Sequence, residues 1–89
     1  MVNKEIEIIN KLGLHARAAA KLVSLASKFT SEVQLRKNNQ EVNAKSIMGV
    51  MMLAASQGTR LELSVSGEDE QEALDAIVEL INDRFGEGQ

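Results

Sequence analysis

The sequence predicts a single α+β domain in which helices cover one face of a four-stranded sheet. Four short segments alternate apolar and polar residues, three longer ones repeat apolar residues at helical spacing, and the order is strand, helix, strand, strand, helix, strand, helix. Because each strand has one polar face, the helices are expected on the other. A length of 89 residues leaves room for one core. This pattern leaves two architectures open, an open-faced sandwich and a ferredoxin-like split βαβ domain with an added helix.

The first half of the chain is expected to hold a strand, a helix and a hairpin. Ile6 and Ile8 alternate with glutamates, which is typical of a half-buried strand. Residues 16 to about 28 form an alanine-rich segment that favours a helix, and its apolar side chains at helical spacing are Ala19, Leu22, Val23 and Ala26, followed by Phe29. Alternation resumes over residues 32–36. A short strand over residues 41–43 then completes the hairpin, because the asparagine pair at 38–39 tolerates the positive φ of a tight turn.

The second half is expected to hold a short helix, a strand and a long helix. Ser46 is a good N-cap residue for a short helix over residues 47–54. Residues 60–66 alternate as a fourth strand. The last helix is expected to begin at Glu68 or Asp69, with further acidic residues in its first turn. Its apolar stripe consists of Ala73, Leu74, Ile77, Val78, Ile81 and Phe85.

The composition argues against several classes of function. With 13 Asp and Glu against 10 Lys and Arg, and only two aromatic residues, the chain is a poor candidate for nucleic-acid binding. It has no cysteine and one histidine, so a disulfide or a zinc site is not expected, and no cofactor is implied. No apolar run approaches the roughly 20 residues that span a bilayer, so we expect a cytoplasmic protein without membrane insertion. The polar residues 86–89 are expected to form a flexible tail.

The most informative segment runs from Gly13 to Val23, with the sequence GLHARAAAKLV, and it contains the single histidine, His15. Since a strand ends just before it and a helix begins just after it, His15 is expected at a helix entry, where the first N–H groups lack partners. These donors and the helix dipole favour an anion. A neutral imidazole is a competent nucleophile, so His15, two residues from Arg17, is suited to carry a phosphoryl group. The alternative is an ordinary surface histidine near a helix cap.

Two segments of the chain resemble the HPr family, the histidine-containing phosphocarriers of the bacterial phosphoenolpyruvate-dependent phosphotransferase system. GLHARAAAKLV resembles the family's active-site segment, and KSIMGVMML, residues 45–53, resembles its regulatory serine segment. Their order and separation also fit, so the resemblance covers nearly the whole chain. It implies one HPr-like domain over residues 1–89, an open-faced β-sandwich with a four-stranded antiparallel sheet and three helices on one face. Ala18 stands where many members have proline, which leaves the chemistry of His15 untouched.

The resemblance also implies a site and partners. In the family, the matching histidine takes a phosphoryl group from Enzyme I and passes it to an EIIA-type domain of the sugar phosphotransferase system, and the matching arginine lies beside the phosphate. We therefore expect His15 to be the phosphate carrier, Arg17 to assist it, and the protein to be a monomeric stoichiometric carrier rather than an enzyme. The docking surface implied for these partners consists of Ala16, Arg17, Ala20, Lys21, Ser24, Ile47, Met48 and Met51.

Ser46 and the short helix after it admit two interpretations each. A serine N-cap stabilises a helix by about 1 kcal/mol and needs no further role; in some bacteria, however, the matching serine is phosphorylated by an HPr serine kinase. The methionines of residues 47–54 are either core filler or, because this helix has more apolar residues than one buried face needs, an adaptable docking surface. Gly49 indicates either a close approach of a partner or tight packing.

Two other functions remain open at this level. The nitrogen-related paralogue of the family, usually called NPr, shares the same motifs and would signal through phosphorylation-dependent docking. A small enzyme with His15 as its general base is a poorer candidate, because the sequence offers no obvious carboxylate near His15 to orient the ring and a small α+β domain has little room for a substrate pocket.

Overall fold

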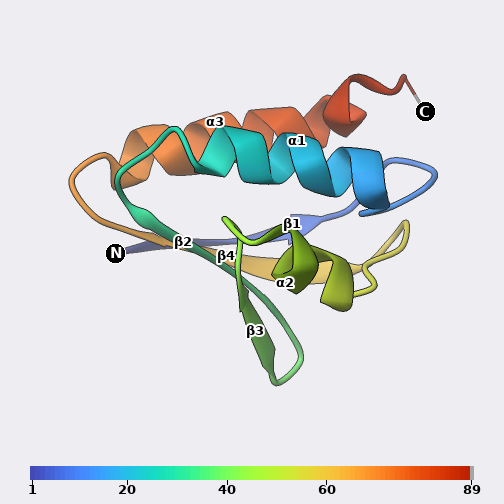
Figure 1. The fold of residues 1–89 in the computed structure, drawn as a ribbon, viewed down its shortest axis with the longest axis horizontal. Helices are drawn as coiled ribbons and strands as arrows, with labels where there is room; N and C mark the ends of the chain where they lie inside the picture. The colour runs from blue at the N-terminus through green and yellow to red at the C-terminus, as the bar shows by residue number, and fades with distance from the viewer. Residues whose placement is uncertain (89) are drawn as a thin grey trace.

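The computed structural model describes residues 1–88 and contains the predicted elements in the predicted order (Figure 1). The strands are β1 (Val2–Glu7), β2 (Glu32–Lys37), β3 (Gln40–Asn43) and β4 (Arg60–Ser66), and the helices are α1 (Ala16–Ala26), α2 (Ile47–Met52) and α3 (Glu70–Asn82). A short 3₁₀ turn, Arg84–Gly86, follows α3. Within the described residues, no helix is both long and apolar enough to cross a membrane.

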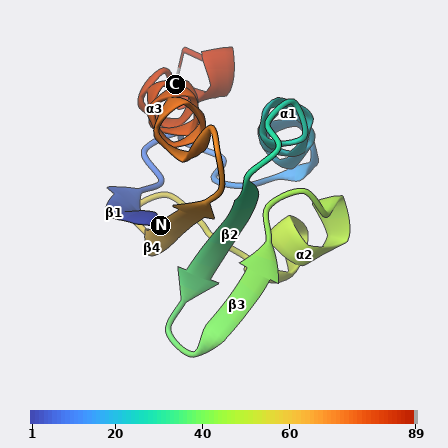
Figure 2. The same cartoon turned by 90° about the vertical axis from the view of Figure 1, so that its left-hand side faces the viewer.

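The four strands form one sheet in the order β1-β4-β2-β3, and each neighbouring pair is antiparallel. On β4, Leu61, Leu63 and Val65 are buried while the residues between them are more accessible, so one face of the sheet is covered and the other meets solvent. The three helices lie on the covered side (Figure 2). The predicted open-faced α+β sandwich is therefore confirmed.

The core lies between this sheet face and the helices. The alanine-rich face of α1 and the predicted stripe of α3 both enter it, although Val78 is only partly buried. The prediction that Phe85 continues the α3 stripe is wrong, because α3 ends at Asn82. Phe85 instead lies in the 3₁₀ turn with φ of 55°, and it is nevertheless fully buried. Burial of this large ring holds the turn after α3 in place.

Asp69 precedes α3 as expected, but its side chain does not cap that helix. It accepts hydrogen bonds from the backbone N–H groups of Thr30 and Ser31, both at 3.0 Å, and from the Ser31 hydroxyl at 2.5 Å. The hydroxyl bond, followed by the Thr30 N–H bond, lowers the pKa of Asp69 to about 2. Asp69 thus ties the start of α3 to the loop between α1 and β2.

This arrangement predicts how acid destabilises the protein. Asp69 stays ionised to about pH 2 when folded but takes up its proton near pH 3.8 when unfolded, so its contribution to stability is complete above that range and is lost as the pH falls through it. Asp69→Asn should lower stability at neutral pH and reduce the loss between pH ~4 and ~2. Asp75→Asn, at an exposed position of α3, is the control. Urea unfolding at several pH values measures both; an unchanged acid dependence in Asp69→Asn would assign the effect elsewhere.

Candidate functional site

His15 is the N-cap residue of α1, as the sequence predicts. Its backbone is extended, its carbonyl accepts the Ala19 N–H at 2.8 Å, and its ring nitrogen Nδ1 accepts the Arg17 N–H at 3.3 Å. Gly13 pins the preceding turn: its φ is 68°, and a Cβ there would lie 2.5 Å from the Ala55 carbonyl oxygen. The imidazole is therefore held at the end of the helix where unpaired N–H groups and the dipole favour an anion.

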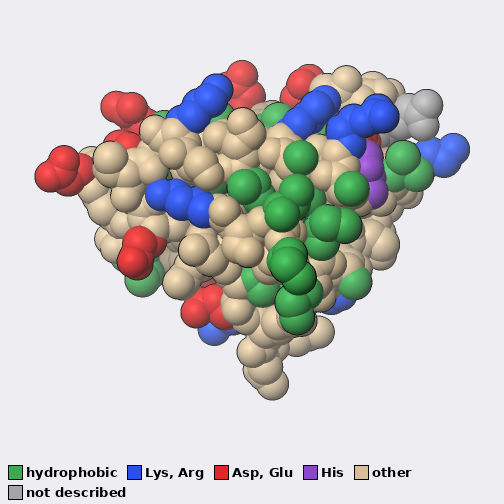
Figure 3. Space-filling model, viewed as in Figure 1, with side chains coloured by type: hydrophobic (Ala, Val, Ile, Leu, Met, Phe, Trp, Pro, Cys, Tyr) green, Lys and Arg blue, Asp and Glu red, His purple; other side chains and the backbone are tan. Residues whose placement is uncertain are grey.

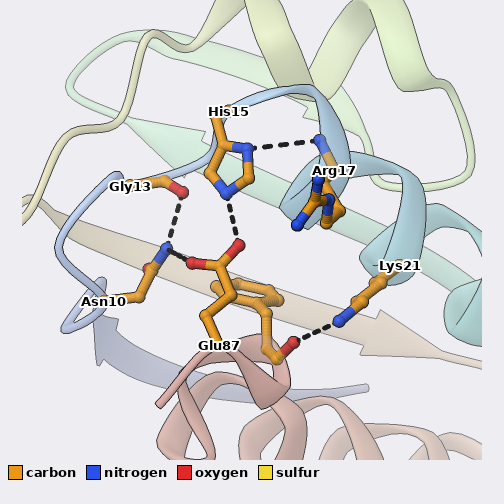
Figure 4. A network of polar contacts seen from close by, with 7 residues as sticks. Asn10, Gly13, His15, Arg17, Lys21 and Glu87 are labelled. Atoms are coloured by element: carbon orange, nitrogen blue, oxygen red, sulfur yellow. Dashed lines mark hydrogen bonds and ion pairs between the residues drawn. The ribbon is translucent and has the colours of Figure 1, made fainter. Parts of the chain in front are cut away.

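A carboxylate contacts the other ring nitrogen of His15 (Figure 4). Nε2 pairs with Oε2 of Glu87, and the two side chains are only 27% and 13% exposed. Because Nδ1 faces an N–H donor and Nε2 faces a carboxylate, the hydrogen-bond partners assign the ring proton to Nε2 and leave the lone pair on Nδ1. The ring is thus presented as the Nε2–H tautomer.

Glu87 has a second partner, Asn10. The Asn10 side-chain Nδ2 donates to Oε1 of Glu87 at 3.1 Å and to the Gly13 carbonyl at 2.8 Å. Partial burial raises the pKa of Glu87, but the hydrogen bonds from Asn10 and His15 and the nearby charge of Lys21 outweigh it and leave the pKa below its ordinary value. Glu87 therefore acts as an ionised acceptor.

The expectation that no carboxylate lies near His15 is wrong. Glu87 is 72 positions further along the chain, in the segment expected to be a flexible tail, and no spacing rule connects the two. In the structure Gly86 closes the 3₁₀ turn and Glu87 has two side-chain partners; Gln89 lies outside the described residues.

Two cations lie on one side of the imidazole. Arg17 is exposed and lies beside the ring, and Lys21 donates from Nζ to the Phe85 carbonyl at 2.6 Å (Figure 4). Together with Leu12 and Glu87, these residues line a shallow, open depression next to His15. The depression offers positive charge and first-turn N–H groups on the Nδ1 side of the ring.

All members of the predicted docking surface are exposed on α1 and α2: Ala16, Arg17, Ala20, Lys21, Ser24, Ile47, Met48 and Met51. Figure 3 shows apolar side chains gathered over these two helices, with the histidine at one end of the gathering and lysine and arginine above it. Two further exposed apolar residues are Met52, one of the methionines expected to be either core filler or docking surface, and Leu12, which the sequence did not single out; they are 65% and 66% exposed. A large apolar residue next to a turn glycine was the available signal for Leu12.

The short helix α2 is capped by Ser46, as predicted. Its hydroxyl accepts the Gly49 N–H at 3.2 Å, and the side chain is otherwise exposed. Only Val50 of this helix is buried, so its methionines are not core filler. A Cβ at Gly49 would lie 3.4 Å from both the Asn43 carbonyl and the Val42 Cβ, so tight packing against β3 accounts for the glycine.

The fold and the site together define a class: a small α+β domain that presents one histidine, paired to a carboxylate, at a helix N-terminus. The family model described as the PTS HPr component phosphorylation site matches residues 2–83. The chain belongs to the HPr family of the phosphotransferase system.

Known relatives agree in length and shape. A phosphocarrier protein HPr from Cupriavidus necator is 57% identical over 89 residues, which covers all of both chains. The crystal structure of an HPr from Thermoanaerobacter tengcongensis is 55% identical, covers 98% of each chain and superposes with a TM-score of 0.95. A Bacillus subtilis Crh, described as a domain-swapped dimer, is 49% identical with a TM-score of 0.76 and covers 94% of this chain and 97% of its own.

Proposed function

We propose that this protein accepts a phosphoryl group from phospho-Enzyme I on His15 and passes it to EIIA-type domains of the sugar phosphotransferase system. The observation that carries the proposal is His15 Nδ1 itself, which accepts the Arg17 N–H at the positive end of α1 and is therefore an unprotonated nitrogen able to act as a nucleophile. A bond forms between Nδ1 and phosphorus as the bond between phosphorus and the donor breaks, and the donor keeps that electron pair. In the second transfer the bond between Nδ1 and phosphorus breaks, Nδ1 keeps the electron pair, and phosphorus bonds to the acceptor.

The neighbours of His15 support both the free and the phosphorylated state. In the free state the Arg17 N–H bonds to Nδ1; once Nδ1 carries phosphate, this donor and the exposed guanidinium are available to the phosphate oxygens. The group is held by dispersed charge rather than by an enclosed pocket. An open site of this kind suits a carrier that must release its cargo to a second protein.

The exposed apolar surface on α1 and α2 is the proposed docking face for both partners. Met48 is 72% exposed, and flexible methionines adapt to more than one partner surface. Because the face adjoins His15, docking would bring a partner's phosphoryl group within reach of Nδ1. A monomeric state and a cytoplasmic location stay predictions from the sequence. The Cupriavidus relative is named HPr, and none of these observations favours the NPr alternative.

The test is phosphorylation by phosphoenolpyruvate and a catalytic amount of Enzyme I, followed by intact-mass measurement. The protein should gain one phosphoryl group that is labile to acid and heat, and should lose it on addition of an EIIA domain. Lack of any mass gain with active Enzyme I of the sugar branch would refute the proposed function. A gain only with the nitrogen-branch Enzyme I would assign the protein to NPr instead.

Ser46 offers a regulatory prediction. Phosphate there would add roughly −1.5 to −2 charges at a helix N-terminus, where the fold tolerates it, but beside the apolar residues Ile47 and Met48. Ser46→Asp should weaken Enzyme I binding, more strongly at low salt, because exposed charges are screened over roughly 8–10 Å in ordinary buffers. Ser46→Ala should lose about 1 kcal/mol of stability with the cap and bind normally. The affinity of each variant for Enzyme I is measured at two salt concentrations. Affinities that are equal for the two variants at both concentrations would leave Ser46 with the role of helix cap alone.

A further inference from the structure

The backbone after α3 has an unusual conformation that places Glu87 next to His15. Arg84 and Phe85 both have positive φ, 54° and 55°, which residues with side chains rarely adopt. Phe85 is fully buried and its carbonyl accepts the Lys21 ammonium, so the strained turn is anchored twice. The chain is thereby folded back over the start of α1. These residues lie beyond the 2–83 stretch that the family model matches.

Asn10 is the second residue that orients Glu87. Its side chain is fully buried, yet its Oδ1 has no hydrogen-bond partner within residues 1–88. Its Nδ2, by contrast, has two partners, the Gly13 carbonyl and Glu87. The Gly13 bond fixes which end of the amide faces Glu87, so Asn10 presents only a donor to that carboxylate.

We propose that Glu87, oriented by Asn10, is a positioning residue that holds His15 in the Nε2–H tautomer and so keeps Nδ1 unprotonated for phosphoryl transfer. This inference rests on the proposed function of His15. Glu87 accepts from Nε2–H and stays ionised, and no proton leaves the ring during transfer. When Nδ1 gains the phosphoryl group, the ring acquires positive charge, and the carboxylate across it stabilises that charge.

Glu87→Gln tests the inference sharply because glutamine has one acceptor and one donor end. Asn10 presents a donor, so the new oxygen faces Asn10 and the new NH₂ faces His15 Nε2. A hydrogen bond from this NH₂ requires Nε2 to accept, which places the ring proton on Nδ1 in place of the lone pair that accepts the Arg17 N–H. Glu87→Ala, in contrast, removes the restraint without imposing the wrong tautomer. Glutamine should therefore be the more damaging substitution although it is closer in shape.

The first readout is the ¹⁵N spectrum of the His15 ring in buffer alkaline enough to keep the ring neutral. The Nε2–H form should dominate in the unmodified protein and become the minor form in Glu87→Gln. The second readout is the rate of phosphorylation by Enzyme I, which should fall at least about tenfold in Glu87→Gln and less in Glu87→Ala. Glu79→Gln, an equal charge change at an exposed position of α3, should change neither readout.

The two readouts distinguish a failure of the positioning role of Glu87 from a failure of the proposed function of His15. An unchanged tautomer in Glu87→Gln, or a loss of rate in Glu87→Ala equal to or greater than that in Glu87→Gln, overturns the positioning role. The spectrum needs no partner protein, so it stands even if Enzyme I fails to phosphorylate the chain. That failure would instead refute the proposed function.

Discussion

Replacing His15 with alanine should abolish the mass gain that phosphoenolpyruvate and Enzyme I produce. The chain has one histidine and no cysteine, so no second imidazole or thiolate can take over the acid-labile phosphoryl group. The loss should be complete rather than partial, because the variant has no imidazole at the site. Intact mass before and after incubation measures it.

His15→Asn is the matched control for folding. The His15 ring accepts the Arg17 N–H as an N-cap, and its removal by alanine should cost about 0.5–2 kcal/mol. Asparagine is a good N-cap residue and should retain most of that stability while still accepting no phosphoryl group. If either variant gained the heat-labile mass, His15 would not be the carrier.

Replacing Phe85 with alanine should cause the largest loss of stability of any change considered. The ring is fully buried under the turn that follows α3, and removing a buried phenylalanine side chain typically costs about 3–5 kcal/mol. Phe29, the only other aromatic residue, is partly buried and serves as the control. Urea unfolding of Phe85→Ala and Phe29→Ala gives both values. A smaller loss for Phe85→Ala than for Phe29→Ala would contradict the anchoring role.

The Phe85→Ala variant also tests whether burial of this ring in the core holds Glu87 next to His15. Glu87 follows two residues later, so loosening the turn should weaken its contact with His15. The His15 ring spectrum of folded Phe85→Ala should therefore move toward that of Glu87→Ala. A spectrum identical to the unmodified protein would show that Asn10 alone is enough to hold Glu87.

The features that the sequence predicted correctly depend on residues close together in the chain. Alternation located β2 and β4, although β1 runs from Val2 to Glu7 and leaves Ile8 outside it. Ser46 marked the start of α2, and the helix that begins at Ala16 placed His15 at a helix entry. The features missed depend on residues distant in sequence. Helical spacing wrongly extended the predicted apolar stripe of α3 to Phe85. The two successive non-glycine residues at positive φ that follow the helix have no sequence signature, so its end could not be predicted. Asp69 and Glu87 found partners 38 and 72 positions away, which no spacing rule anticipates.

All four methionines of the chain are exposed, and three of them, Met48, Met51 and Met52, lie on α2. A peroxide can therefore reach these thioethers without unfolding the protein. Conversion to the sulfoxide would make the proposed docking face polar and chiral while leaving the core, which contains no methionine among its buried residues, intact. Oxidative damage would then weaken partner binding before it lowers the stability of the fold, and methionine sulfoxide reductases would restore partner binding. The adaptability of this face and its chemical vulnerability come from the same sulfur atoms.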